Sequence, residues 1–299
     1  MVDRVIVVIL NPAAGSSRLE NLAEHLAALF EAAAAPAQIV SLGSPAEASS
    51  AIRTALTRGA DVVVAAGGDG TVNRVAAALV DTETALGVIP LGTLNHFAKD
   101  CGIPLDLARA VQTVAAGHVT HVDVGDVNGR IFLNNSSIGV YPSIVEARER
   151  LRARGRSKWT SLVLATLEVL RQGDDLSVRL ETDHRKIIAR TPFVFVGNNE
   201  YQTQGLGLGS RSRLDARRVY AYFAPPLRTY RLPNLLAHAL FHRTGREQVL
   251  TSVAASELWI DTPLTSSINV ACDGELERMA TPLHYRSWPG ALRVISPQE

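Results

Sequence analysis

The stretch DVVVAAGGDGT, Asp61–Thr71, continues into VNRVAAALV and carries the clearest structural pattern of the sequence. Its first part, Asp61–Ala66, is a short run rich in valine that is typical of a buried strand. Apolar residues then recur at i, i+3, i+4 and i+7 from Val72 to Leu79, which predicts a helix with one buried face. The glycines of Gly67–Gly70 therefore lie where a strand passes into a helix.

A glycine-rich loop at that position suits an anion. Glycine has no Cβ, so backbone N–H groups can approach a phosphate closely, and the helix N-terminus adds the positive end of its dipole. Asp69 within the loop suits a divalent cation that accompanies the phosphate, or a proton to be moved. The alternative is a tight strand-to-helix turn whose glycines serve packing, and this loop alone leaves both interpretations open.

Two further loops favour the binding interpretation. NPAAG, Asn11–Gly15, follows the first apolar run, and PLGTLN, Pro90–Asn95, follows another. Asn11 and Thr93 offer neutral donors and acceptors to phosphate or ribose oxygens. Taken singly, an Asn-Pro turn and a Thr helix cap explain them better. Because ligands bind beyond the carboxyl ends of strands in open α/β sheets, the three loops together predict one site.

The rest of the chain divides into two patterns. Up to about residue 125, strand-like runs alternate with helical stretches, which predicts an α/β domain with a parallel sheet over residues 1–125. The runs are Val5–Leu10, Asp61–Ala66 and Leu86–Pro90, and the helical stretches include Leu19–Ala35 and Pro45–Thr57.

After His121 the chain is mostly short strands, separated by turn signals such as Asn128-Gly129 and Asp273-Gly274. Residues 126–299 are therefore predicted to form a β-rich, sandwich-like domain, whose last strand packs back on the first. The predicted strands are Val122–Val127, Arg130–Leu133, Leu176–Leu180, Lys186–Ala189, Phe193–Val196, Val219–Phe223, Glu257–Asp261, Ser267–Ala271 and Leu292–Ile295. Two helical segments, Ser143–Gln172 and Leu232–Phe241, interrupt them.

Composition excludes several classes of protein. The 299 residues are 46% hydrophobic and 20% charged, which is typical of a globular protein, and a formal net charge of +1 gives no field that would draw nucleic acid. Cys101 and Cys272 form neither a metal-binding spacing nor a disulfide framework, which favours a reducing cytoplasm. No apolar stretch reaches the length of a transmembrane segment, so a lipid substrate would be met at a membrane surface.

NPAAG, GGDGTVN and PLGTLNHFA, in this order, resemble the catalytic domain of the diacylglycerol kinases. That superfamily also contains sphingosine and ceramide kinases and bacterial lipid kinases. The resemblance continues through VDVGDVNGRIFLNNSSIGVYP, FVGNNEY, INVACDGE and PGALRV, and so covers nearly the whole chain. It implies an α/β nucleotide domain, a β-rich domain and an active site in the cleft between them.

By this resemblance the chain is an ATP- and Mg²⁺-dependent lipid kinase, cytoplasmic with peripheral contact at the inner membrane face, and active in phospholipid biosynthesis. The residues implied to contact ATP are Asn11, Ser41, Gly67, Gly68, Gly70, Thr71, Asn73 and Thr93. Asp69 lies where a carboxylate binds magnesium beside the phosphates, and Glu275 matches the residue that accepts the proton of the lipid hydroxyl. Relatives often form homodimers.

Some positions depart from the family pattern. Ala14 and Ser17 replace the second glycine of the first loop. Many bacterial relatives use a Leu-x-Asp-Gly segment for a structural magnesium ion, but Ala216 and Arg217 occupy those Asp and Gly positions, which leaves the neighbouring Asp215 as the candidate ligand.

Two other features have an ordinary alternative. From spacing alone, Asp273-Gly274-Glu275 is better explained as a hairpin turn with exposed acids, and only the resemblance favours Glu275 as the base. The basic segment Arg148–Lys158 is a solvated helix face or a contact with anionic lipid headgroups.

Four other functions share single features with a lipid kinase. No GxxxxGK[ST] motif occurs, which excludes a P-loop NTPase. An NAD-kinase-like small-molecule kinase shares the GGDGT motif, and a catalytically silent lipid- or nucleotide-binding module shares the fold. A dinucleotide-dependent oxidoreductase ranks last, because no G-x-G-x-x-G follows the first strand.

Overall fold

A computed structural model describes residues 4–12, 21–140, 142–144, 175–202, 210–224 and 250–298. The predicted helices Ser143–Gln172 and Leu232–Phe241 and the basic segment Arg148–Lys158 lie outside the described residues, apart from 143 and 144. Within the described part of the chain, no helix is long and apolar enough to cross a membrane.

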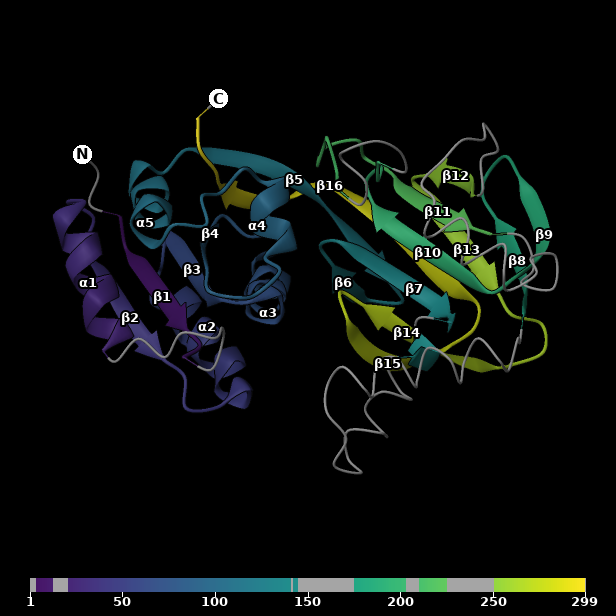
Figure 1. Cartoon of the computed structure of the whole chain (residues 1–299), viewed down its shortest axis with the longest axis horizontal. Coiled ribbons are helices and arrows are strands. Elements are labelled where there is room, and N and C mark those ends of the chain that lie inside the picture. The colour runs from purple at the N-terminus through teal and green to yellow at the C-terminus, as the bar shows by residue number, and fades with distance from the viewer. Residues whose placement is uncertain are drawn as a thin grey trace, which may run out of the picture.

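The first half is the α/β unit that the sequence predicts. Four strands pair in parallel in the order β2-β1-β3-β4, and helices cover both faces of the sheet (Figure 1). The strands are β1 (Ile6–Leu10), β2 (Ala37–Ser41), β3 (Val62–Gly67) and β4 (Ala85–Pro90). The helices are α1 (Leu22–Ala32), α2 (Ala48–Thr57), α3 (Asp69–Leu79), α4 (His96–Asp100) and α5 (Leu107–Ala116), with a 3-10 turn η1 (Pro45–Glu47) before α2.

Strands β1, β3 and β4 are buried along their whole length, which explains why they read as continuous apolar runs. The face of α3 predicted to be apolar is the buried one, and Val75, Ala76 and Leu79 are fully enclosed against the sheet.

The parallel sheet continues into the second half through the last strand. The carboxyl-terminal part of β16 (Leu283–Ile295) pairs in parallel with β4, and its first part pairs antiparallel with β13 (Glu257–Asp261). Beyond β13 lie β8 (Leu176–Glu181) and β9 (Lys186–Thr191), while β5 (Val119–Val127) pairs with both β16 and β6 (Arg130–Phe132). The division into domains at residue 125 stays a prediction, since β5 and β16 both run along the junction (Figure 1).

A second, six-stranded antiparallel sheet covers this extension. Its order is β12-β11-β10-β7-β14-β15. The strands are β7 (Asn135–Gly139), β10 (Phe193–Asn198), β11 (Val219–Phe223), β12 (Thr251–Ala255), β14 (Ser267–Cys272) and β15 (Glu275–Ala280). One hydrophobic cluster joins the two sheets, with Leu258 and Tyr285 from the first and Val196 and Val270 from the second. The β-rich, sandwich-like second half is therefore confirmed.

Both predicted two-residue turns are confirmed as hairpin turns. Asn128 and Gly129 have φ of 50° and 87°, and Asp273 and Gly274 have φ of 47° and 87°. Positive φ at both central residues is the backbone that matches the twist of a two-residue hairpin. The first turn joins β5 to β6, and the second joins β14 to β15.

Candidate active site

The three loops singled out in the sequence meet at the carboxyl ends of the parallel strands. Asn11 follows β1, and its Nδ2 donates to Oγ1 of Thr71 in α3 at 3.1 Å. The loop after β4 is held by the Leu91 N–H, which donates to the Gly67 carbonyl at 2.9 Å, and by the Asn95 N–H, which donates to Oδ2 of Asp69 at 3.0 Å. The first and third loops are thus tied to the glycine loop between them.

The glycines of the central loop, and Gly92 of the third loop that packs on it, do not all serve the same purpose. A Cβ on Gly67 would lie 2.4 Å from Oγ1 of Thr71, and a Cβ on Gly92 would lie 2.6 Å from the Cα of Gly68. These positions need glycine for packing alone. A Cβ on Gly70 would meet only Oε1 of Glu275, at 3.9 Å. Packing therefore explains the first part of the loop, whereas Gly70 faces the opposite wall of a cleft.

The start of α3 is suited to an anion. Its N-cap residue is Gly68, which provides no side-chain hydrogen bond to the first turn. The N–H groups of Thr71 and Val72 already donate to the Gly68 carbonyl, at 2.9 and 3.1 Å, so the amides before them, Asp69 and Gly70, are the ones that an anion would meet. The dipole of this 11-residue helix adds partial positive charge at the same end. Phosphate oxygens fit such a position.

A magnesium ion at this place would depend on Asp69. Within the described ranges there is no group of three or more His, Cys, Asp or Glu side chains that could hold a metal ion. Magnesium commonly takes only one or two carboxylates and completes its shell with substrate phosphates and water. The single half-buried carboxylate of Asp69, in the first turn of α3, fits that arrangement.

Glu275 stands on the other wall of the cleft, at the start of β15. Its turn is fixed by Asp273, whose carboxylate accepts from the N–H groups of Leu133, Asn134 and Asn135 at 2.7, 2.9 and 2.9 Å. Burial raises the pKa of the Asp273 carboxyl, and the three N–H groups act against that rise. The turn is thus anchored to the strand junction between β6 and β7.

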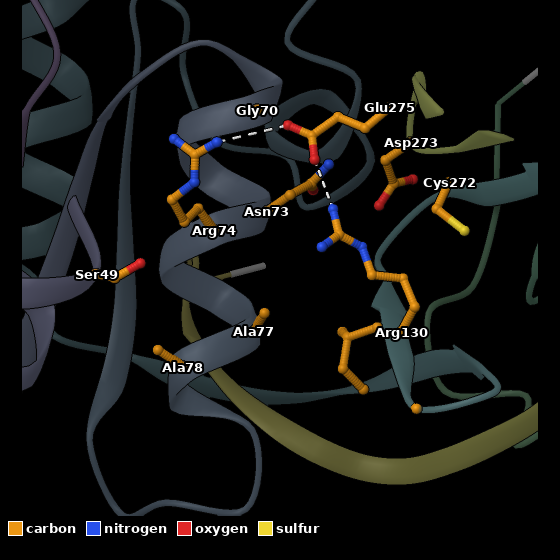
Figure 2. A pocket seen from close by; sticks show the side chains of 12 residues that line it. Ser49, Gly70, Asn73, Arg74, Ala77, Ala78, Arg130, Cys272, Asp273 and Glu275 are labelled. Atoms are coloured by element: carbon orange, nitrogen blue, oxygen red, sulfur yellow. Dashed lines mark hydrogen bonds and ion pairs between the residues drawn. The ribbon is translucent and has the colours of Figure 1, made fainter. Parts of the chain in front are cut away.

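Two arginines from different halves reach the Glu275 carboxylate (Figure 2). Nη2 of Arg130, in β6, lies 2.5 Å from Oε2, and Nη2 of Arg74, in α3, lies 3.6 Å from Oε1. Nε of Arg130 also lies 3.8 Å from Oε2 of Glu277. Arg74, Arg130 and Glu275, with Gly70, Asn73 and Ile131, line a cavity of about 420 Å³ that extends along α3.

The remaining candidate residues lie at varied distances from this cavity. Asn73 lines it, and its Oδ1 is buried with no hydrogen-bond partner among the described residues. Ser41 ends β2 opposite Leu10, and it lines a separate cavity of about 340 Å³ between the sheet and α2. Thr93 is exposed in the β4–α4 loop. Asp215 is exposed and forms an ion pair with Arg213, Nε to Oδ1 at 3.0 Å, and among the described residues it belongs to no group of three or more potential metal ligands.

Buried Arg211 joins the two halves beneath the site. Its Nε and Nη2 reach Oδ2 of Asp100, the last residue of α4, at 2.9 and 2.8 Å. Nη1 donates to the carbonyls of Leu133 and Asn198 at 2.6 and 3.0 Å, and Nη2 donates to Oδ1 of Asn134 at 2.8 Å. The Arg211 side chain is 0% exposed, so the junction that holds Asp273 rests on a fully enclosed cation.

The sequence motifs gave no role to Arg74, Arg130 or Arg211. They also did not predict that Asp273 anchors the turn before Glu275. Arg74 and Arg130 lie directly beside recognised signals, GGDGTVN and the Asn128-Gly129 turn, but nothing local indicates that both point at Glu275. Asn95 belongs to the third motif, and its N–H donates to Asp69, which explains why that motif lies against the glycine loop.

Comparisons with known proteins match the first half of the chain by sequence and nearly the whole chain by fold. Residues 5–127 match the sequence model of the diacylglycerol kinase catalytic domain. A diacylglycerol kinase of Bacillus subtilis (strain 168) is 39% identical over 133 residues, which cover 42% of this chain and 43% of that protein. A probable lipid kinase of Yersinia pestis (strain Pestoides F) is 37% identical over 108 residues, or 34% of this chain and 36% of that protein. The chain thus spans less than half the length of these curated relatives.

The fold is shared over a longer stretch. The crystal structure of a putative diacylglycerol kinase from Bacillus anthracis str. Sterne matches with a TM-score of 0.76 and 24% identity, covering 98% of each chain. The resemblance predicted from the motifs is confirmed for residues 5–127, and the two-part fold is confirmed for nearly the whole chain.

Proposed function

We propose that this chain, which carries a diacylglycerol kinase catalytic domain in residues 5–127, transfers the γ-phosphate of ATP to a hydroxyl group of a lipid. One observation supports this most strongly. Oε1 of Glu275 lies 3.9 Å from the position of a Cβ on Gly70, so the carboxylate faces the glycine loop across the cleft. An anion site and a carboxylate base face to face are the two parts that this transfer needs.

In the proposed complex, the nucleotide phosphates bind the amides at the start of α3, between the loops that carry Asn11 and Thr93. Thr71 and Asn73 complete this wall, and Ser41 lies farther along the sheet edge on the side of β2. A magnesium ion held by Asp69 would supply charge neutralisation to the phosphates. The Asn95 N–H keeps the Asp69 carboxylate oriented through Oδ2.

The proposed chemistry places Glu275 as the base. Glu275 accepts the proton of the lipid hydroxyl, and the hydroxyl oxygen forms a bond to the γ-phosphorus. The bond from that phosphorus to the bridging oxygen of ADP breaks, so ADP leaves with its electron pair. Positioning and electrostatic stabilisation supply most of the rate in phosphoryl transfer, and a base adds about 10²–10⁴-fold.

The lipid and its place are part of the proposal. Diacylglycerol is the first acceptor to test, since that substrate stands in the names of relatives from Bacillus subtilis and Bacillus anthracis. A cytoplasmic enzyme of this kind would meet its acceptor by peripheral contact with the inner membrane face. The homodimer, the second magnesium ion at Asp215 and the absence of nucleic-acid binding stay predictions.

Two variants test the assigned roles. Asp69→Ala is expected to abolish transfer, because the phosphates lose their metal-binding carboxylate. Glu275→Gln is expected to slow turnover by about 10²–10⁴-fold while nucleotide still binds. Turnover with dioleoylglycerol in mixed micelles and nucleotide affinity by calorimetry separate the two. A wild-type rate in Glu275→Gln would remove the base, and full activity in Asp69→Ala would remove the metal role.

A further inference from the structure

The guanidinium groups of Arg74 and Arg130 converge on one carboxylate in the cavity beside the glycine loop. Arg74 comes from α3 and Arg130 from β6, and they approach Oε1 and Oε2 of Glu275 at 3.6 and 2.5 Å. Their side chains are 36% and 45% exposed, so a ligand entering the cavity can reach both (Figure 2).

We infer that Arg74 and Arg130 form a binding pair for a phosphoryl group, and that Glu275 occupies its place until the phosphoryl group arrives. This inference rests on the proposed function. A phosphoryl group has more oxygens and more negative charge than a carboxylate, and arginine binds it through paired N–H donors. A phosphoryl group is therefore a stronger ligand than the Glu275 carboxylate for these two arginines.

Stability alone is a poor reason for this arrangement. Ion pairs between half-exposed side chains contribute little to folding, because water screens both charges. The cavity also suits a polar group better than an acyl chain, since the charged side chains of Arg74, Arg130 and Glu275 line it together with the amide of Asn73. A phosphorylated group fits the size, the charge and the lining.

The exchange would also free the base. While Arg130 holds Oε2 at 2.5 Å, the guanidinium occupies one lone pair of that oxygen and fixes the direction of the carboxylate. Once a phosphoryl group takes over the guanidinium groups, Glu275 is released toward the acceptor. The pair therefore couples the presence of substrate to the readiness of the base.

The phosphoryl group has two conceivable sources: the γ-phosphate of ATP, or a phosphate within the head of the acceptor lipid. Binding of AMP-PNP and of ADP, each with Mg²⁺, tests the first by calorimetry without an acceptor. KM values for neutral dioleoylglycerol and for phosphatidylglycerol, at saturating ATP, test the second.

Arg74→Gln and Arg130→Gln are expected to act on one arm only. If the ligand is the γ-phosphate, both variants weaken the affinity for AMP-PNP by about 10- to 100-fold and leave the affinity for ADP unchanged. This is the effect of losing a hydrogen bond to a charged group. For a lipid phosphate they raise the KM of phosphatidylglycerol by the same factor and leave dioleoylglycerol unchanged. Either result supports the pair and names its ligand.

A third variant separates binding from structure. Glu275→Gln removes the competing charge, so the phosphoryl ligand is expected to bind about two- to fivefold tighter, the scale of a half-exposed ion pair. A purely structural ion pair predicts no such gain. Arg179→Gln is the matched control, because Arg179 Nη1 lies 3.8 Å from Asp261 Oδ2 at 42% exposure, away from the cavity.

The outcomes separate the two proposals. If wild type phosphorylates a lipid and both arginine variants equal wild type in AMP-PNP affinity and in both KM values, the phosphoryl pair is overturned and the kinase stands. If no lipid is phosphorylated but the arginine variants lose AMP-PNP affinity alone, the pair stands and the lipid acceptor is wrong. Wild type that binds neither nucleotide and phosphorylates no lipid overturns both.

Discussion

Replacing Arg211 with alanine is expected to destabilise the chain strongly. The side chain is fully buried and joins Asp100 of the first half to Leu133, Asn134 and Asn198 of the second. Removing it leaves a carboxylate that is only 10% exposed without its cation, and two backbone carbonyls without one of their donors.

The magnitude follows from those contacts. Breaking a buried ion pair on one side costs about 3–5 kcal/mol, because the remaining charge stays desolvated. Asp100 keeps slight contact with water, so the lower end, about 3 kcal/mol of unfolding free energy, is expected for Arg211→Ala. Adding Asp100→Asn should recover part of this loss, since the unpaired buried charge is then gone. The unfolding free energy of the double variant should exceed that of Arg211→Ala by about 1 kcal/mol or more.

Urea unfolding followed by circular dichroism measures the effect, with the midpoint compared at unchanged slope. Arg213→Ala is the control two residues away, where both partners of the ion pair are mostly exposed, and no measurable change is expected there. An Arg211→Ala midpoint equal to that of the control would refute the reasoning that this cation fastens the two halves together.

Gly67→Ala should lose about 1–3 kcal/mol of stability, because its Cβ would lie 2.4 Å from Thr71, whereas Gly70→Ala should fold as well as wild type and lose transfer activity beside Glu275. Equal melting temperatures of the two variants would contradict this division of the loop. Burial raises the pKa of the Cys101 and Cys272 thiols to about 12, so little thiolate forms near neutrality and native labelling by a disulfide reagent should keep accelerating up to pH 10. A plateau by pH 9, as in free cysteine, would contradict it.

The sequence predicted the first half well because its pattern is local. Buried parallel strands read as apolar runs, and α3 shows its buried face directly in the spacing of Val75, Ala76 and Leu79. The helix α5 was not predicted, although Asp106 caps it by accepting from the Arg109 N–H and Gly117 ends it at φ 68°.

The strands missed in the second half lack a local signal. β7 reads NSSIG, yet it is central in its sheet. Ser136 is fully buried there, and the Tyr285 hydroxyl, 3.0 Å from its Oγ, satisfies its hydrogen-bonding group. β15 reads ELERMA, with charges that suit an edge strand. Tertiary partners, and not local propensity, make these segments strands.

The candidate site divides in the same way. The loops with Asn11, Asp69 and Thr93 could be placed together, because parallel strands end at one edge of a sheet. The approach of Glu275 depends on the second sheet, and spacing alone favoured an exposed hairpin turn. The structure keeps the turn but anchors it through Asp273, which only the meeting of β6, β7 and β14 makes possible.

Transfer of labelled γ-phosphate from ATP to a panel of lipids in mixed micelles tests the central claim most directly. The panel contains diacylglycerol, monoacylglycerol, a sphingoid base, ceramide and phosphatidylglycerol, with NAD as a soluble acceptor and Asp69→Ala beside wild type. A lipid kinase is expected to give a labelled lipid with wild type only, and that lipid names the acceptor class. Labelled NAD, or no labelled product while ATP still binds, would contradict this expectation.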